Sequence, residues 1–433
     1  MKVLKFGGSS VGDAQAMRRV LDIANNQDGN LILVLSACSG ITNKLIRITE
    51  FSSADEIKQL YSEIEEFHKD LMRDLTGEVS NELDQLLTEL NNLIEGICLL
   101  SECTDKTSKS ILAYGELLSS TIFYSFSKIN NLSVSFLDIR KVLILNWKKI
   151  NAEISKKLLS EVIEKKNSET NIIITQGFIV ADNNGNTSNL GRGGSDYSAA
   201  IIASLLGAEE LQIWTDVPGI MSANPKEIES ARTINEMTTS EVEELSFFGA
   251  KVIHPETIKP AIDSNIPVYV LNSFDAGSAV TLIKSEFSKS EAKLHSMHII
   301  KDCLWLEFSD ESFGHSIKRQ GELLELIDER EIKLIYSELR GRKNNYILAG
   351  DNLRFLNEYL YQNKPKRKNV SIIAICGVNL KDKSAMDIIE SLADLLKDYE
   401  NTSMLISGSE NSILVQTTKD NEKMLAIKLH EVI

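Results

Sequence analysis

The sequence lacks several features that would place it in whole classes of protein. Its five cysteines are odd in number and scattered, with no C-x-x-C pair, so neither a disulfide framework nor a zinc knuckle is expected. No apolar run is long enough to span a membrane. The N-terminus enters a strand pattern directly, without the basic start, apolar stretch and cleavage site of a secretory signal. We therefore expect a cytoplasmic protein whose thiols are buried.

Positive charge is also scarce. The 433 residues include 47 Lys and Arg against 62 Asp and Glu, which gives a formal net charge of −15. This balance offers no electrostatic reason to bind nucleic acid or an anionic membrane, so an anionic ligand needs a locally positive pocket. His295 and His298 have no further ligand-type residues at metal spacing, and we expect them to be solvated, with no structural metal.

The first two thirds of the chain read as an α/β domain. Up to about residue 284, short β-branched runs alternate with longer amphipathic segments, which favours a mainly parallel sheet. The strand candidates are MKVLKF, NLILVLSA, NIIITQGFIV, LQIWTD and IPVYVL. Between residues 51 and 130, apolar residues recur every three or four positions and predict packing helices. Small, hydroxyl and charged residues follow four of the five strands, so we expect ligands at the carboxyl edge of the sheet.

The composition changes after residue 284. A polar segment precedes two units that each read strand, helix, strand, strand, and a last helix begins near Asp420. This repeat predicts a duplicated α+β module, with the basic run NKPKRKN as a solvated linker. The second unit looks one strand short, and we expect the upstream segment LHSMHII to supply that strand. A chain of this length exceeds one hydrophobic core, and the expected domains are 1–284, 292–362 and 368–433.

The segment KFGGSS is the first candidate for binding chemistry. Gly7 and Gly8 let backbone amides approach an oxyanion, and Ser9 and Ser10 add hydroxyl donors ahead of a helix that begins near residue 12 or 13. The segment is not a Walker A loop, because Lys5 precedes the glycines and ends the strand itself. Taken alone, the hexapeptide fits an anion site and an ordinary Gly-Gly turn equally well.

A second glycine-rich segment, NLGRGGSDYSAAIIASLLGA, favours the anion site. Its glycines flank Arg192, while Ser195 and Asp196 stand at the start of an alanine-rich helix. The planar guanidinium of arginine suits a carboxylate or phosphate, and amides at a helix start favour negative charge. A capped helix after a glycine turn would explain the segment without a ligand, but it leaves Arg192 unexplained.

Six blocks of the sequence together resemble the aspartokinases of the amino-acid kinase family. They are KFGGSSV, SACSGITNKL, AYGELLSS, GRGGSDYSA, WTDVPGIMSANP and FGAKVIHPETI, and they appear in the family's order between residue 5 and about residue 260. The resemblance implies a three-layer sandwich with a mainly parallel central sheet, followed by two ferredoxin-like ACT regulatory modules. It also implies ATP-dependent phosphorylation of the side-chain carboxylate of L-aspartate to 4-phospho-L-aspartate, the first step towards lysine, threonine and methionine.

The resemblance assigns roles that agree with the chemistry of the reaction. An aspartate carboxylate is already ionised at neutral pH, so the reaction needs positioning and charge neutralisation rather than a general base. Lys5 is expected to lie over the transferring phosphoryl group, Lys251 to bind nucleotide phosphate, and Asp196 to hold the lysine ammonium groups. For the substrate, the resemblance implies four contacts: Arg192 to the α-carboxylate, Glu116 to the α-ammonium, and further contacts from Ser36 and Thr42.

The resemblance implies a nucleotide site as well. The residues expected to hold ATP are Lys5, Gly7, Gly8, Ser9, Ser10, Thr215, Asp216, Met221, Asn224, Lys226 and Lys251. Mg²⁺ is expected to bridge the phosphates, held by nucleotide and water rather than by a protein metal site. Where this chain has Met221, Asn224 and Lys226, the family usually has Tyr, Asp and Arg, so the adenine contacts should differ.

Two alternatives stay open. The chain could be a sister kinase that acts on another carboxylate, or a catalytically inactive homologue that senses an amino acid. The leading interpretation is an active aspartokinase without a fused homoserine dehydrogenase. We expect a homodimer or dimer of dimers through the ACT modules, with lysine or threonine as a candidate effector. The stretch FSDESFGHSIKRQGELLEL lacks the small-residue effector loop, so no effector contact is assigned.

Overall fold

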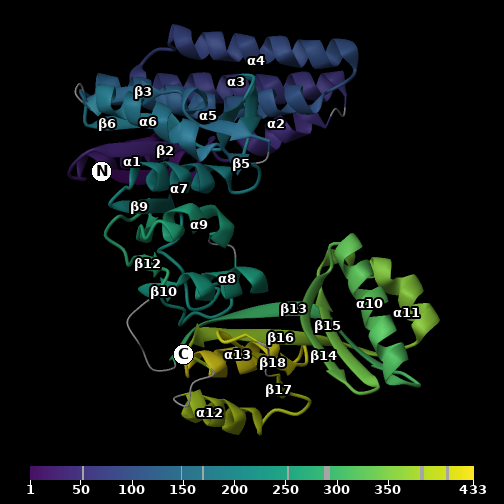
Figure 1. Cartoon of the computed structure of the whole chain (residues 1–433). Helices are drawn as coiled ribbons and strands as arrows, with labels where there is room; N and C mark the ends of the chain where they lie inside the picture. The colour runs from purple at the N-terminus through teal and green to yellow at the C-terminus, as the bar shows by residue number, and fades with distance from the viewer. Residues whose placement is uncertain are drawn as a thin grey trace. The chain divides into compact units, whose positions relative to one another are not determined.

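The computed structural model describes residues 1–50, 53–147, 149–167, 170–250, 253–286, 293–380, 385–405 and 409–433. These residues form two compact units (Figure 1). Unit 1 comprises Met1–Ile220, Asn235–Thr239 and Ile253–Glu286, and unit 2 comprises Met221–Ile234, Ser240–Val252 and Phe287–Ile433. Within the described residues, no helix is long and apolar enough to cross a membrane.

Unit 1 is built on an eight-stranded sheet with the order β10-β12-β11-β9-β1-β2-β6-β3. Its strands are β1 (Lys2–Phe6), β2 (Leu31–Leu35), β3 (Val134–Leu137), β6 (Ile172–Gln176), β9 (Glu210–Thr215), β10 (Glu236–Thr238), β11 (Val268–Asn272) and β12 (Thr281–Lys284). Neighbouring strands are parallel except β11 and β12. The prediction of a mainly parallel sheet is therefore confirmed.

Helices cover both faces of this sheet. One layer contains α1 (Ala14–Asn25), α2 (Ile41–Thr49), α3 (Ala54–Thr76), α4 (Asn81–Leu100) and α5 (Asp105–Ile129), and the other contains α6 (Ala152–Asn167), α7 (Gly194–Leu206) and α9 (Pro255–Asp263). The long helices α3, α4 and α5 lie against one another in Figure 1. Leu4 and Phe6 belong to the apolar cluster of the first layer. Because side chains alternate along a strand, Lys5 faces the second layer, where α7 contacts β1.

The segment NIIITQGFIV, expected to be one strand, is two. β6 ends at Gln176, and β7 (Ile179–Asp182) belongs to a separate four-stranded sheet with β4 (Ile144–Asn146), β5 (Lys149–Ile150) and β8 (Thr187–Asn189). Between them, Phe178 has a φ of 63°, in the left-handed region that bulky residues rarely occupy. This backbone turn carries the chain from one sheet to the other, and a pattern of apolar residues does not reveal it.

The helical layer of unit 1 contains a fully buried histidine, His68 on α3. Its Nδ1 lies 2.6 Å from the carbonyl oxygen of Ile64, and burial lowers the pKa of the imidazole to about 4. Since this pKa is below the ordinary value of about 6.5, the unfolded chain binds a proton that the folded chain does not. Between pH 6.5 and pH 4, His68 should therefore cost about 3 kcal/mol of stability.

The variant His68→Gln, which keeps a hydrogen-bond donor but cannot be charged, tests this expectation. We expect the melting temperature of the native protein to fall more steeply than that of the variant as the pH is lowered from 6.5 to 4. Thermal unfolding followed by circular dichroism at several pH values measures the difference. Parallel curves for the two proteins would show that His68 does not contribute.

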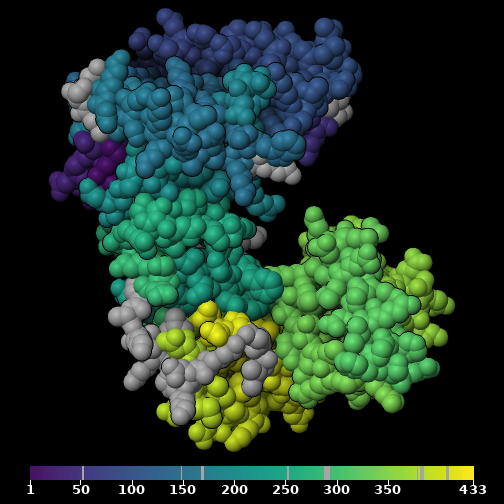
Figure 2. Space-filling view, in the orientation of Figure 1, coloured from purple at the N-terminus to yellow at the C-terminus, as the bar shows by residue number. Residues whose placement is uncertain are grey.

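Unit 2 contains one antiparallel six-stranded sheet with the order β14-β15-β13-β16-β18-β17. The first repeat consists of β13 (Lys293–Ser309), α10 (Phe313–Glu329), β14 (Lys333–Arg340) and β15 (Lys343–Ala349), and α11 (Asn357–Asn363) follows it. The second consists of β16 (Lys366–Val378), α12 (Met386–Leu396), β17 (Ser403–Leu405), β18 (Ser412–Thr417) and α13 (Glu422–His430). In Figure 2 the first repeat forms a green lobe and the second is yellow.

Two predictions about these repeats have different outcomes. The segment LHSMHII does supply a strand to the second repeat, because it is the first half of β13 and pairs with β16 from Ile372 to Gly377. The prediction that NKPKRKN is a linker is wrong for the second half of this run, because β16 begins at Lys366, which pairs with Glu307. A run of exposed basic residues is compatible with a strand whose side chains face water, so charge alone could not identify the linker.

The expectation that His295 and His298 are solvated is wrong. The Nδ1 atom of His295 lies 2.5 Å from the carboxylate of Glu241, whose side chain is 1% exposed. Burial lowers the pKa of His298, which lies against Gly249. These contacts come from the segment Ser240–Val252, which joins unit 2 although it precedes the repeats by some forty residues in sequence. No periodic pattern links residues so far apart.

A second early segment, Met221–Ile234, is also part of unit 2. Ala223 and Ile228 belong to the apolar cluster of the second repeat. His430 on α13 joins the segment at two points, because its Nε2 lies 2.8 Å from the hydroxyl of Ser222 and its Nδ1 lies 3.0 Å from that of Ser230. The segment between β9 and β10 is thus held by the last helix of the second repeat.

Candidate active site

A cavity of about 860 Å³ in unit 1 collects most of the predicted site residues. Its walls include Lys5, Gly8, Ser9, Ser36, Thr42, Glu116, Arg192, Asp196 and Asp216. They come from the end of β1, from the loops after β1, β2 and β9, from α2 and α5, and from the loop and first turn at the start of α7. The cavity therefore lies at the carboxyl ends of the parallel strands, as the sequence predicts.

Lys5 and Asp196 form an ion pair inside this cavity. The distance from the lysine Nζ to the aspartate Oδ1 is 2.7 Å, and the two side chains are only 11% and 18% exposed. Asp196 lies in the first turn of α7. The ion pair shows that the segment KFGGSS and the glycine-rich segment at the start of α7 meet in the fold. It also holds the ammonium group of Lys5 at the cavity wall.

The two glycines after Lys5 have separate structural roles. A Cβ atom on Gly8 would lie 2.9 Å from the carbonyl oxygen of Ala37, closer than real Cβ contacts, so no side chain fits there. A Cβ atom on Gly7 would lie 3.6 Å from the Nζ atom of Lys5, in ordinary van der Waals contact with the ammonium group. The N–H of Gly7 donates to the carbonyl of Trp214 and is not directed at a ligand.

Glu116 supplies a buried carboxyl group to the cavity. Burial raises its pKa to about 8, against the opposing effects of the backbone N–H groups of Ala37 and Glu116 and of the Lys5 charge. Its Oε2 atom is buried and has no hydrogen-bond partner among the described residues. A buried carboxyl oxygen without a donor costs free energy, and a donor on a ligand would satisfy this one.

Arg192 lies at the cavity wall on the loop before α7. Its side chain is exposed and forms no ion pair with any residue in the described part of the chain. The neighbouring Gly191 and Gly193 have φ values of 76° and 68°, in the left-handed region that favours glycine. The loop thus presents a guanidinium group that is available to an anion.

The two glycines beside Arg192 form a matched pair for a stability test. Both require positive φ, but a Cβ atom on Gly193 would also lie 2.6 Å from Cγ2 of Thr257, whereas Gly191 has open space. We expect Gly191→Ala to destabilise by about 1 kcal/mol and Gly193→Ala by roughly 1 to 3 kcal/mol more. Denaturant titration compares them, and equal losses would contradict the crowding at Gly193.

Other predicted residues lie elsewhere. The hydroxyl of Ser10 is 2.7 Å from that of Ser273 and is not among the cavity residues, and the hydroxyl of Thr215 donates to the carboxylate of Asp216. Met221, Asn224 and Lys226 belong to unit 2. Lys251 lies outside the described residues.

The cavity also has walls that the sequence did not assign to the site. Phe178, Asn189 and Ser195 belong to this group. The sequence predicts Ser195 as a helix-start residue, and its Cα atom lies so close to Gly177 that a Cβ atom on Gly177 would be 2.8 Å away. Phe178 has no sequence signal, because its position depends on the left-handed turn after β6.

The described residues contain no group of three or more His, Cys, Asp or Glu side chains that could hold a metal ion. Asp216 is a cavity carboxylate that is not engaged with a lysine in the described structure.

Comparison with known proteins gives consistent matches. The model of the amino acid kinase family matches residues 1–272. Lysine-sensitive aspartokinase 3 of Escherichia coli is 35% identical over 291 residues, which is 65% of this chain and 63% of that protein. The bifunctional aspartokinase/homoserine dehydrogenase of Buchnera aphidicola is 30% identical over an alignment that covers 97% of this chain and 55% of that protein. The chain therefore spans less than two thirds of the length of these relatives.

Solved structures match over the whole chain. E. coli aspartokinase III in complex with lysine and aspartate has a TM-score of 0.85 at 26% identity, over 100% of this chain and 99% of that one. The same protein in complex with aspartate and ADP has a TM-score of 0.77, also at 26% identity, and the coverage is again 100% and 99%. These likenesses confirm the predicted fold class, a three-layer α/β sandwich followed by two ferredoxin-like α+β repeats.

Proposed function

Because the chain belongs to the amino acid kinase family, we propose that it is an aspartate kinase. In this reaction ATP transfers its terminal phosphoryl group to the side-chain carboxylate of L-aspartate and gives 4-phospho-L-aspartate and ADP. The names of the similar proteins support the substrate, since they include aspartokinases and a complex with aspartate and ADP.

One observation carries the proposal: the cavity offers a partner for each charged group of aspartate. The free guanidinium of Arg192 suits the α-carboxylate, and the unsatisfied Oε2 atom of Glu116 suits the α-ammonium. The Lys5 ammonium, held by Asp196, suits the negative charge where the side-chain carboxylate meets the phosphoryl group. Ser36 and Thr42 add hydroxyl groups to the same wall.

The chemistry needs little more than this arrangement. The carboxylate oxygen of aspartate attacks the γ-phosphorus, and the bond from phosphorus to the β,γ-bridging oxygen of ATP breaks. No proton has to be removed from the nucleophile, since the carboxylate is ionised at neutral pH. Lys5 would neutralise charge on the phosphoryl oxygens, and Asp196 would keep its ammonium group in place. Lys251 is proposed to bind the nucleotide phosphates.

The nucleotide is proposed to contact the loop that follows β1 and the end of β9. The proposed contacts in unit 1 are Gly7, Gly8, Ser9, Ser10, Thr215 and Asp216. Mg²⁺ bound to the phosphates would supply further charge neutralisation. Asp216 is the cavity carboxylate proposed to lie near Mg²⁺, because burial raises the pKa of Glu116 and Asp196 is paired with Lys5.

Regulation is proposed to reside in unit 2. Its two repeats have the strand and helix order of ACT domains, and the similar E. coli protein was solved with lysine. We propose lysine or threonine as the effector and a homodimer as the assembly. Activity titrated with lysine, with threonine and with both together tests the effector, and sedimentation tests the assembly.

The proposed activity itself is tested with purified protein, ATP, Mg²⁺ and L-aspartate. Hydroxylamine should trap the acyl phosphate as a coloured hydroxamate, formed in step with ADP. Turnover of L-glutamate or another carboxylate in place of aspartate would identify a sister kinase. A protein that binds an amino acid but turns over no carboxylate would be the inactive sensor.

A further inference from the structure

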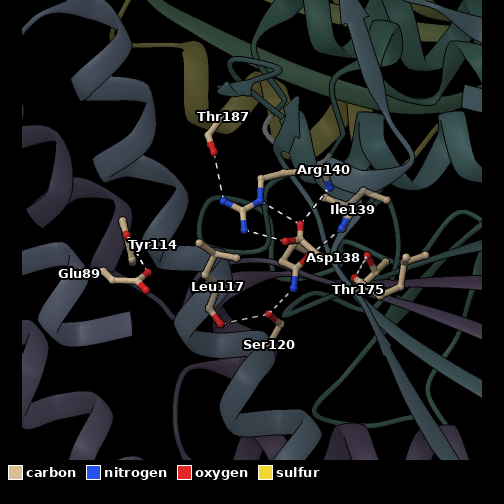
Figure 3. A network of polar contacts seen from close by, with 11 residues as sticks. Glu89, Tyr114, Leu117, Ser120, Asp138, Ile139, Arg140, Thr175 and Thr187 are labelled. Atoms are coloured by element: carbon tan, nitrogen blue, oxygen red, sulfur yellow. Dashed lines mark hydrogen bonds and ion pairs between the residues drawn. The ribbon is translucent and has the colours of Figure 1, made fainter. Parts of the chain in front are cut away.

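A polar network in unit 1 joins residues that do not line this cavity (Figure 3). At its centre, the guanidinium of Arg140 donates two hydrogen bonds to the carboxylate of Asp138. Nε donates to Oδ1 at 2.9 Å, and Nη2 donates to Oδ2 at 2.7 Å. The remaining Nη1 donates to the hydroxyl of Thr187 at 3.1 Å. Burial alone would raise the pKa of Asp138, but the hydrogen bonds and charge of Arg140 bring it below its ordinary value.

One branch of the network leads to the loop that carries Arg192. Thr187 is the first residue of β8, and Asn189, its last residue, is part of the cavity wall. The next N–H, of Leu190, donates to the carbonyl of Phe178 at 2.9 Å, and Arg192 follows two residues later. The hydrogen bond from Arg140 therefore fixes the start of a short strand whose end sets the position of the guanidinium at the cavity.

A second branch leads to the helix that carries Glu116. The side chain of Gln176 is fully buried; its Oε1 accepts from the N–H of Ile139 at 3.1 Å, and its Nε2 donates to the hydroxyl of Ser120 at 2.9 Å. Ser120 lies on α5 one turn after Glu116. Ile139 stands between Asp138 and Arg140, so the two branches meet at the same short turn.

We propose that Arg140 is a positioning residue for amino acid recognition, which acts through Thr187 on the loop that carries Arg192. The inference deepens the proposed function and rests on it. The bidentate pair with Asp138 gives the Arg140 side chain one geometry, so the hydrogen bond to Thr187 has a fixed direction. Within the described residues, the side-chain hydrogen bonds of Arg140 go to Asp138 and Thr187 and do not reach Lys5 or the loop after it, so this network should affect the amino acid and not the nucleotide.

The test compares Michaelis constants for the two substrates in four variants. Thr187→Val removes only the hydroxyl at nearly constant shape, and Thr187→Ser restores it. We expect Thr187→Val to raise the KM for L-aspartate about threefold to tenfold, Thr187→Ser to restore it, and Arg140→Gln to raise it by about tenfold or more, with the KM for ATP unchanged. The matched control is Thr170→Val, which removes a hydroxyl that bonds to Ser135 in the same unit.

A second measurement tests the stability of the loop in the absence of substrate. Hydrogen exchange of the free protein should show faster exchange for residues 187–194 in Thr187→Val and Arg140→Gln than in the native protein and in Thr170→Val. If the native protein does not phosphorylate aspartate, the proposed function is wrong. The exchange rates of the loop still test the positioning role of Arg140 in that case. Unchanged exchange in this loop, or equal changes in both Michaelis constants, would overturn the positioning role.

Discussion

Replacing Lys5 with methionine should lower kcat by about 10²-fold to 10³-fold. The Lys5 side chain is 11% exposed and its ammonium group lies 2.7 Å from Oδ1 of Asp196, so the charge has a fixed position at the cavity wall. A fixed cation in a site that excludes water stabilises developing phosphoryl charge without reorganising during the reaction. Methionine fills a similar volume but carries no charge. Steady-state kinetics by the hydroxamate assay measures the loss.

The controls separate charge from folding. Lys5→Met leaves Asp196 without its partner, so the double variant Lys5→Met/Asp196→Asn is needed to remove both charges together. We expect the double variant to regain any lost melting temperature and to stay inactive. Lys2→Met is a matched control on the same strand, because Lys2 pairs with Glu210 and is not a cavity residue. Near-native activity in both Lys5 variants would contradict the assigned role.

Glu116→Gln should stabilise the free protein while it weakens aspartate binding. The pKa of Glu116 is about 8 when folded and about 4.5 when unfolded, so the folded state keeps a proton that the unfolded state releases. Stability is therefore lost as the pH rises from 4.5 to 8, and at pH 7 the loss is about 3 kcal/mol. Glutamine resembles the protonated form and avoids this loss. The gain in melting temperature should be largest near pH 8 and absent below pH 4.5.

Glu116→Gln should also change the number of protons released when aspartate binds, and the affinity for aspartate. An α-ammonium group beside Glu116 favours the carboxylate, so binding to the native protein at pH 7 should release up to about one proton. Calorimetry in buffers of different ionisation enthalpy counts this proton, and Glu116→Gln should release none. The affinity of the variant should fall about tenfold to a hundredfold, as expected for the loss of a charged hydrogen bond. Native binding without proton release would contradict the contact with Glu116.

The sequence predicts the sheet and much of the site because both depend on local patterns. The apolar runs of β1, β2 and β9 identify buried parallel strands, and the glycines around Arg192 mark left-handed turns. The meeting of Lys5 with Asp196 follows from the topology, since both lie at the carboxyl edge of the sheet. The roles of individual residues came from the resemblance, and the structure supplies their geometry.

What the sequence could not predict depends on contacts between distant residues. The contact of His295 with Glu241 and that of His430 with Ser222 join residues that are 54 and 208 positions apart. Phe178 reaches the cavity through a left-handed backbone conformation that its side chain disfavours. The hydroxyls of Ser9 and Ser10 look equivalent in sequence, yet Ser10 bonds to Ser273 while Ser9 lines the cavity, a difference set by the tertiary contact.

The hydrogen bonds between His430 of α13 and the segment Met221–Ile234 can form only late in the synthesis of the chain. Ser222 is translated long before His430. At roughly 5 to 20 residues per second, the 208 positions between them take about 10 to 40 s to translate. During that interval Ala223 and Ile228 lack the part of their apolar cluster that α13 supplies, Leu425, Ala426 and Leu429. A nascent chain therefore completes the packing around this segment only after α13 has been translated.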